Sequence, residues 1–146
     1  MHETLLGIGM NDAVCEHLAN STSARFAMYV YVNFLMGFGT AVFKVPAVHY
    51  YKAMNDLVIQ SGKKFGQLDV EELKVIAGLF KAIQPIPINV WEQLQLALKS
   101  IYSTWYSEKA VTFRSEVYNL SQDPGVAVIV QCMIFGESGT CFSRLV

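Results

Sequence analysis

The chain has 146 residues, a net charge of −1 at pH 7, 53% hydrophobic residues and only 16% charged residues. The length is enough for one domain with a single buried core, and the near-zero charge leaves no excess of lysine or arginine to neutralise the phosphates of a nucleic acid. We therefore expect no nucleic-acid partner, and we expect the apolar surplus to be deeply buried or covered by a partner.

Cysteine usage bears on the cellular compartment. Cys15, Cys132 and Cys141 lie far apart, and no secretory signal precedes them. An odd number of cysteines at such spacings predicts neither a disulfide framework nor a zinc site. We interpret them as reduced thiols of an intracellular protein, cytoplasmic by default, with an organelle still open if the chain is a fragment.

The most apolar segment covers residues 26–43 and carries no charge. It just reaches the length at which a membrane span must be considered. Asn33, Thr40 and two glycines interrupt it, however, which favours a buried helix capped by Ser21 or Ser23.

Four more helices are expected downstream. A short one around residues 50–57 precedes the polar turn QSGKKFGQ. Asp69 and Glu72 form a capping box for the next, and the following helices are expected to begin after Asn89 and Ser107. The core-facing residues predicted for the two longest of these helices are Leu73, Ile76, Ala77 and Phe80, and then Leu94, Leu98, Ile101 and Trp105.

The C-terminal part changes character. Residues 125–135 are rich in valine and isoleucine, which predicts a strand inside a covered sheet, and residues 141–146 predict a second, shorter strand. Gln131 would be buried in the first strand and would need a partner, most simply a backbone group of a neighbouring element. The turn GESGT could bind an anion or be a plain hairpin. The predicted fold class is α+β, in one region that is mainly helical over 1–120 and strand–loop–strand over 125–146.

The residues by themselves indicate no catalytic centre. His2, His17 and His49 have no partners at metal-ligand or triad spacing. The glutamates stand mostly at helix starts, where they complement the backbone dipole. We therefore predict no catalytic residue and no metal ligand.

Several stretches resemble the nucleotide-binding part of the pyruvate, phosphate dikinase family. They are EQLQLALKSIYSTWYSEKAVTFR, GVAVIVQCMIFG and SGT, which stand in the same order as the family's SW.SPRA..YR, GTAVN.Q.MVFGN and TSGTGV.FTRNP. Upstream, GMNDAVCEHLAN and ARFAMYVYVNFLMGFG are similar to GLND..V.GLA and ERFAYDSYRRFL.MFG. The resemblance covers nearly the whole chain and is most specific over residues 105–140.

This resemblance implies an ATP-grasp nucleotide site, with the strand as its hinge, and a non-membrane helix at residues 26–43. It makes ATP or another adenine nucleotide the expected ligand, with Mg²⁺ expected only in the intact family enzyme. The residues carried over as the nucleotide site are Gln131 at the hinge, Met133 and Ile134 beside the adenine, and Ser138, Gly139 and Thr140 in the phosphate loop.

Departures from the family pattern limit this expectation. The phosphate loop is shorter here, and Cys141 replaces a glycine that permits close approach to a phosphate. The family's glycine-rich first half of the ATP site and its phosphoryl-carrying histidine are not in this sequence. We expect a truncated dikinase-like chain that binds nucleotide weakly at most and does not by itself convert pyruvate to phosphoenolpyruvate.

A non-catalytic alternative stays open. The chain could be an interaction module or a degenerate gene product that associates with itself or with a full-length relative. The apolar residues expected to form the contact are Tyr29, Val30, Val32 and Met36.

Overall fold

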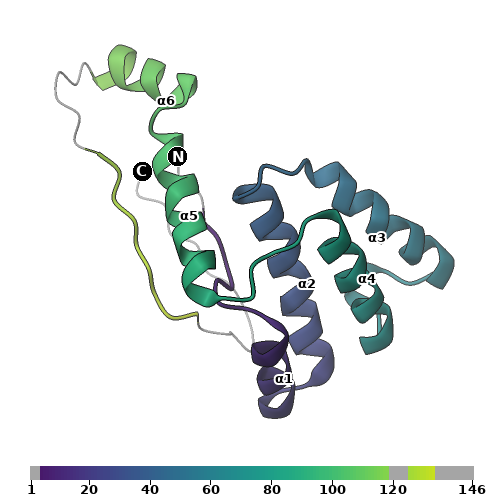
Figure 1. The fold of residues 1–146 in the computed structure, drawn as a ribbon. Helices are drawn as coiled ribbons and strands as arrows, with labels where there is room; N and C mark the ends of the chain where they lie inside the picture. Colours follow the sequence, from purple (N-terminus) through teal and green to yellow (C-terminus); the bar gives the residue numbers. More distant parts are fainter. Residues whose placement is uncertain (1–3, 119–124, 134–146) are drawn as a thin grey trace, which may run out of the picture.

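The structure, a computed structural model, describes residues 4–118 and 125–133. Figure 1 shows α1–α4 gathered into a helical body, with α5 beside it, α6 at the far end of α5, and residues 125–133 running along α5. The helices are α1 (Asp12–Ser21), α2 (Ala24–Ala41), α3 (Ala47–Ser61), α4 (Val70–Ile83), α5 (Val90–Thr104) and α6 (Glu108–Phe113), with a 3₁₀ turn at Phe65–Gln67 and a π-helical turn at Arg114–Tyr118.

The predicted α+β fold is wrong, because the described residues contain helices and no strand. Residues 125–133 cover most of the predicted first strand, yet Ile129 is 87% exposed and the segment lies in neither a helix nor a sheet. A strand is stable only when another strand satisfies its N–H and C=O groups, and the described chain supplies none. The predicted second strand, 141–146, lies outside the described residues.

Helix α2 is the centre of the body. It packs against α1 and α4 and also touches α3 and α5. A helix that is apolar on all sides is expected to be buried, and these neighbours cover most of the uncharged segment. Ser23, one of the two predicted caps, accepts a hydrogen bond from the Phe26 N–H at 3.2 Å.

The contact face predicted on α2 is mostly covered within the protein. Val32 is only 1% exposed, while Val30 and Met36 are partly buried against the core. Tyr29 does reach the surface, but its ring packs on Phe65 with centroids 5.4 Å apart. Of these four residues only Tyr29 is exposed, so the apolar surface on α2 is smaller than predicted, and self-association stays a prediction.

Helix α4 forms as predicted. The Asp69 N–H donates to Glu72 Oε2 at 2.7 Å, and the Glu72 N–H donates to Asp69 Oδ1 at 3.0 Å, which completes the capping box. All four residues predicted to face the core, Leu73, Ile76, Ala77 and Phe80, are buried. Local sequence signals thus predicted both the start of this helix and its buried face.

A glycine sets the distance between α2 and α3. Tyr50 of α3 is fully buried and meets Phe80 edge to face, with ring centroids 4.9 Å apart. A Cβ atom at Gly39 would overlap the Tyr50 hydroxyl and approach its ring carbon Cζ to 2.8 Å. Only glycine allows this approach, so Gly39 is a packing residue rather than a helix breaker.

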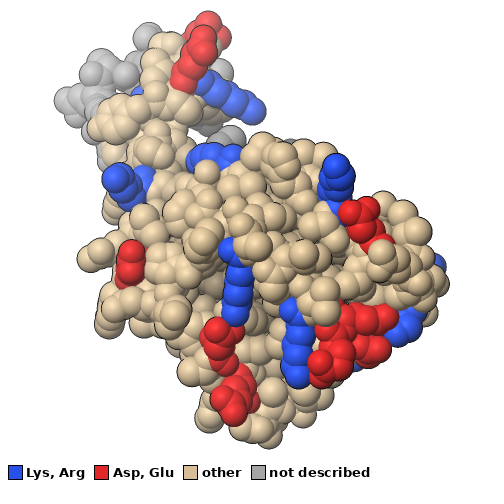
Figure 2. Space-filling view, turned by 45° about the vertical axis from the view of Figure 1, so that its right-hand side comes forward, with Lys and Arg blue, Asp and Glu red and all other residues tan. Residues whose placement is uncertain are grey.

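The charged residues lie mainly on the surface of the body. Figure 2 shows acidic and basic side chains side by side at the lower edge of the molecule, below a broad uncharged area. Lys63 bridges Asp69 and Glu72, with Nζ–Oδ2 and Nζ–Oε2 distances of 3.2 and 2.8 Å. Within residues 4–118 and 125–133, no helix combines the length and hydropathy that crossing a bilayer requires.

We predict that Gly39→Ala destabilises the protein by about 1–3 kcal/mol, because the added methyl group forces α2 and α3 apart. The matched control is Gly37→Ala in the same helix, where a Cβ would have its nearest neighbour, Leu5 Cδ1, at 4.0 Å. That control should be neutral or stabilising by up to about 1 kcal/mol, because alanine favours helix over glycine. Urea unfolding of both variants measures the difference, and equal stabilities would refute this packing role.

Candidate functional site

Helix α5 presents apolar residues on two different faces. One face packs on the body, where Gln93 and Ala97 are buried and the Ser100 hydroxyl donates to the Ala41 carbonyl at 3.0 Å. The residues predicted to face the core lie on the other face and are only partly buried: Leu94, Leu98, Ile101 and Trp105. This second face lines a groove instead of the core.

Gln93 fixes the position of α5. Its Oε1 accepts from the Gly9 N–H at 2.8 Å, and its Nε2 donates to the carbonyls of Met10 at 3.0 Å and Pro87 at 2.7 Å. The amide therefore joins the N-terminal segment, the α4–α5 connection and α5 itself. The sequence offered no signal for this role, because two of the partners stand more than 80 residues away.

The groove lies between three segments of the chain. Residues 4–9 and residues 125–133 form its walls on either side of the outer face of α5. Gly7 and Gly9 have φ angles of 75° and 101°, a conformation that favours glycine and lets the first wall turn toward Gln93. The result is a long, open and mainly apolar channel.

Two of the predicted nucleotide residues line this groove. Gln131 and Met133 both belong to the 125–133 wall, and both are exposed. The prediction that Gln131 is a buried strand residue is wrong, so its amide needs no internal partner. The remaining predicted site residues, Ile134, Ser138, Gly139 and Thr140, lie outside the described residues. The nucleotide-binding role of all six stays a prediction.

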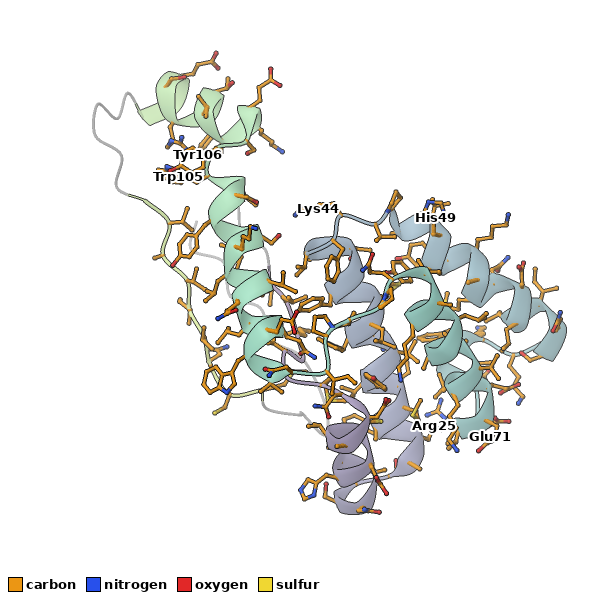
Figure 3. The ribbon with its side chains drawn as sticks, in the orientation of Figure 1. Arg25, Lys44, His49, Glu71, Trp105 and Tyr106 are labelled. Atoms are coloured by element: carbon orange, nitrogen blue, oxygen red, sulfur yellow. The ribbon has the colours of Figure 1, made fainter. Side chains whose placement is uncertain are left out.

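A stacked pair closes one end of the groove. The Arg114 guanidinium lies 3.8 Å from the centroid of the Trp105 ring, and its Nη1 donates to the Trp105 carbonyl at 2.8 Å. Figure 3 shows Trp105 where α5 passes into α6, beside Tyr106. This cation–π contact holds α6 against the end of α5. The sequence predicted Arg114 only as a helix end, because a stacking contact across a turn has no periodic pattern.

Comparison with known proteins gives a consistent relationship. The chain is 33% identical to a pyruvate, phosphate dikinase of Rickettsia conorii, 32% to a chloroplastic one of Zea mays and 31% to one of Clostridium symbiosum. Each match covers 95% of this chain. The chain is a relative of pyruvate, phosphate dikinases.

The relationship concerns a small part of each dikinase. The chain spans 16%, 15% and 17% of the lengths of these three relatives. No protein-family model matches the chain. Because 95% of the chain is matched, most of the helical body and of the groove must correspond to residues of the dikinases.

The groups of this chain whose pKa is shifted lie on the helical body, away from the groove. Lys81 Nζ lies 2.6 Å from Asp12 Oδ1, and this hydrogen bond lowers the pKa of Asp12. Burial raises the pKa of the Cys15 thiol. No group of three histidine, cysteine or acidic residues in the described segments could hold a metal ion. The lining of the groove, which is mainly apolar and includes the Gln131 amide, is suited to hydrogen bonding and apolar contact.

We predict that Gln93→Leu destabilises the protein by about 2–4 kcal/mol, because it leaves one N–H and two carbonyls without their buried partner. Gln95→Ala is the matched control, since Gln95 is an exposed residue of the same helix and should change stability by less than about 0.5 kcal/mol. Hydrogen exchange should also show lost protection at the Gly9 amide. An unchanged Gly9 exchange rate in Gln93→Leu would contradict the assignment.

Proposed function

We propose that the chain is part of the nucleotide-binding region of a pyruvate, phosphate dikinase-like protein. The observation that carries this proposal is the sequence relationship over 95% of the chain. The groove supports it, because its 125–133 wall contains Gln131 and Met133, two of the three residues that the resemblance assigns to the hinge and the adenine. In this proposal, residues 1–146 form a single region of that protein.

The phosphoryl-transfer chemistry in this proposal belongs to an intact dikinase. There, ATP and phosphate would phosphorylate pyruvate to phosphoenolpyruvate through a phosphohistidine, with Mg²⁺ neutralising charge on the phosphates. The present residues would contribute part of the ATP site and no catalytic group. We propose an intracellular location, and the chloroplastic relative from Zea mays makes an organelle as acceptable as the cytoplasm.

The proposed adenine contacts use the exposed wall of the groove. The Gln131 amide can both donate to and accept from a purine edge. The Met133 thioether, which is 41% exposed, offers a polarizable surface for the ring. Ile134 would extend this apolar surface, and Ser138, Gly139 and Thr140 would meet the phosphates. Cys141, in place of a glycine, limits how closely a phosphate can approach.

We predict that adenosine, AMP and ATP bind about equally, with dissociation constants in the millimolar range that corresponds to about 4 kcal/mol. NMR titration measures this, and Met133→Ala should weaken all three ligands. Ile59→Ala, an exposed apolar position on α3 away from the groove, is the matched control and should leave binding unchanged. ATP binding a hundredfold tighter than adenosine, with the margin lost in Thr140→Ala, would instead mean that the phosphate loop works.

We also predict that the purified chain forms no phosphoenolpyruvate from pyruvate, ATP and phosphate, because it lacks the residues that carry and position the phosphoryl group. A coupled assay for phosphoenolpyruvate checks this. Activity that disappears in Gln131→Ala would show that the chain itself is a catalyst, whereas activity indifferent to the substitution would come from a contaminating kinase.

A further inference from the structure

The two tryptophans of the chain line opposite ends of the groove. Trp91 lies in the first turn of α5, and Trp105 directly follows the helix. The ring of Trp105 already has a partner, because the Arg114 guanidinium stacks on it. Within residues 4–118 and 125–133, no ring or cation stacks on the Trp91 indole, which belongs to a residue that is 71% exposed. Tryptophan is highly buried on average, so this exposed aromatic face is open to a ligand in the groove.

The 125–133 wall brings two of the predicted nucleotide residues to the Trp91 end of the groove. Figure 1 shows this segment running along α5 in the opposite direction, from the side of α6 toward the start of α5. Met133 is the last described residue of the segment, and Gln131 precedes it by two positions. Both residues line the groove together with Trp91. An indole, a thioether and an amide therefore lie at one end of the groove.

The first turn of α5 holds Trp91 in a fixed position. Asn89 caps the helix, and its Oδ1 accepts from the Trp91 N–H at 2.9 Å and from the Glu92 N–H at 3.3 Å. Gln93, two residues after Trp91, is anchored by the three hydrogen bonds described above. A side chain on such a rigid element is presented to a ligand with little loss of backbone freedom.

We propose that the Trp91 indole stacks on the base of the bound nucleotide and makes the site selective for purines over pyrimidines. This inference rests on the proposed function and adds a specificity-determining residue to it. The Met133 thioether and the Gln131 amide meet the same base from the 125–133 wall. A two-ring purine covers more of an indole face than a one-ring pyrimidine does, so stacking favours the purine.

The distribution of charge also places the base, rather than the phosphates, at Trp91. Of the described residues that line the groove, the basic ones are Lys109 and Arg114, which lie in α6 and directly after it, at the other end. The groove residues nearest to Trp91 in the sequence, and the residue before Gly9 in the opposite wall, are apolar: Val90, Leu94 and Ile8. Apolar surroundings do not replace the water that a phosphate loses on burial.

NMR titration of the full chain with adenosine, inosine, cytidine and uridine tests the inference. Adenosine should shift the indole N–H signal of Trp91, which is identified by its loss in Trp91→Leu, and both purine nucleosides should bind more tightly than both pyrimidine nucleosides. Trp91→Leu should weaken adenosine binding roughly five- to tenfold and remove most of the preference for purines, whereas Trp91→Phe, which keeps an aromatic face, should retain most of both.

Tyr102→Leu is the matched control. Tyr102 is a 50% exposed aromatic residue of the same helix that is not part of the groove lining as described, so its loss should leave adenosine binding unchanged. Because Trp91 and Tyr102 are both largely exposed, circular dichroism should show wild-type helix content in all three variants.

The outcomes separate this inference from the proposed function. Purines and pyrimidines that bind equally, or adenosine that binds Trp91→Leu as tightly as the wild type, overturn the role of Trp91; the nucleotide site itself then stands if Met133→Ala still weakens adenosine. A wild-type chain that binds no adenosine overturns both.

Discussion

The arrangement of α5 depends on the three hydrogen bonds of the Gln93 amide. A buried amide that satisfies both of its hydrogen-bonding ends costs little, whereas the same groups without partners would each lose stability. Gly9, Met10 and Pro87 supply those partners from two connections that have no regular structure of their own. One side chain therefore places the N-terminal wall, the approach to α5 and α5 itself, and the groove follows from that placement.

The two faces of α5 have different physical roles. The inner face is small and partly polar, as shown by Ala97 and Ser100, and it brings the helix close to α2. The outer face carries large apolar side chains, among them Trp91, which is 71% exposed. Together with the exposed 125–133 segment, it gives this side of the molecule apolar surface that can meet a ligand or another chain. This is consistent with a chain that corresponds to 15–17% of its dikinase relatives.

Local sequence signals predicted where the helices form, but they did not predict what each helix face packs against. The Asp69–Glu72 capping box was predicted as it forms, and Ser23 is one of the two caps that the sequence left open, because both caps depend on neighbours three residues away. The outer residues of α5 were correctly placed on one helix face but assigned to the wrong environment, because periodicity does not say what a face meets. For the same reason, Val32 was predicted to lie on an exposed contact face, whereas it is buried in the core.

The C-terminal segment shows a second limit. A run of valine and isoleucine predicts a strand only if a partner strand exists, and partners are distant in sequence. Residues 125–133 have the composition of a covered strand without the cover. Gln93 is the converse case: a polar residue in a helical pattern gave no reason to expect a buried role.

The most direct test of the account is where a purine binds. In an NMR sample with adenosine and methyl-labelled protein, nuclear Overhauser contacts should connect the adenine protons with the Met133 methyl group and with Leu94 or Leu98 of α5. Contacts to the hollow between α1, α2 and α4, which is lined by Cys15, Met28 and Ala77, would contradict the assignment of the groove as the nucleotide site.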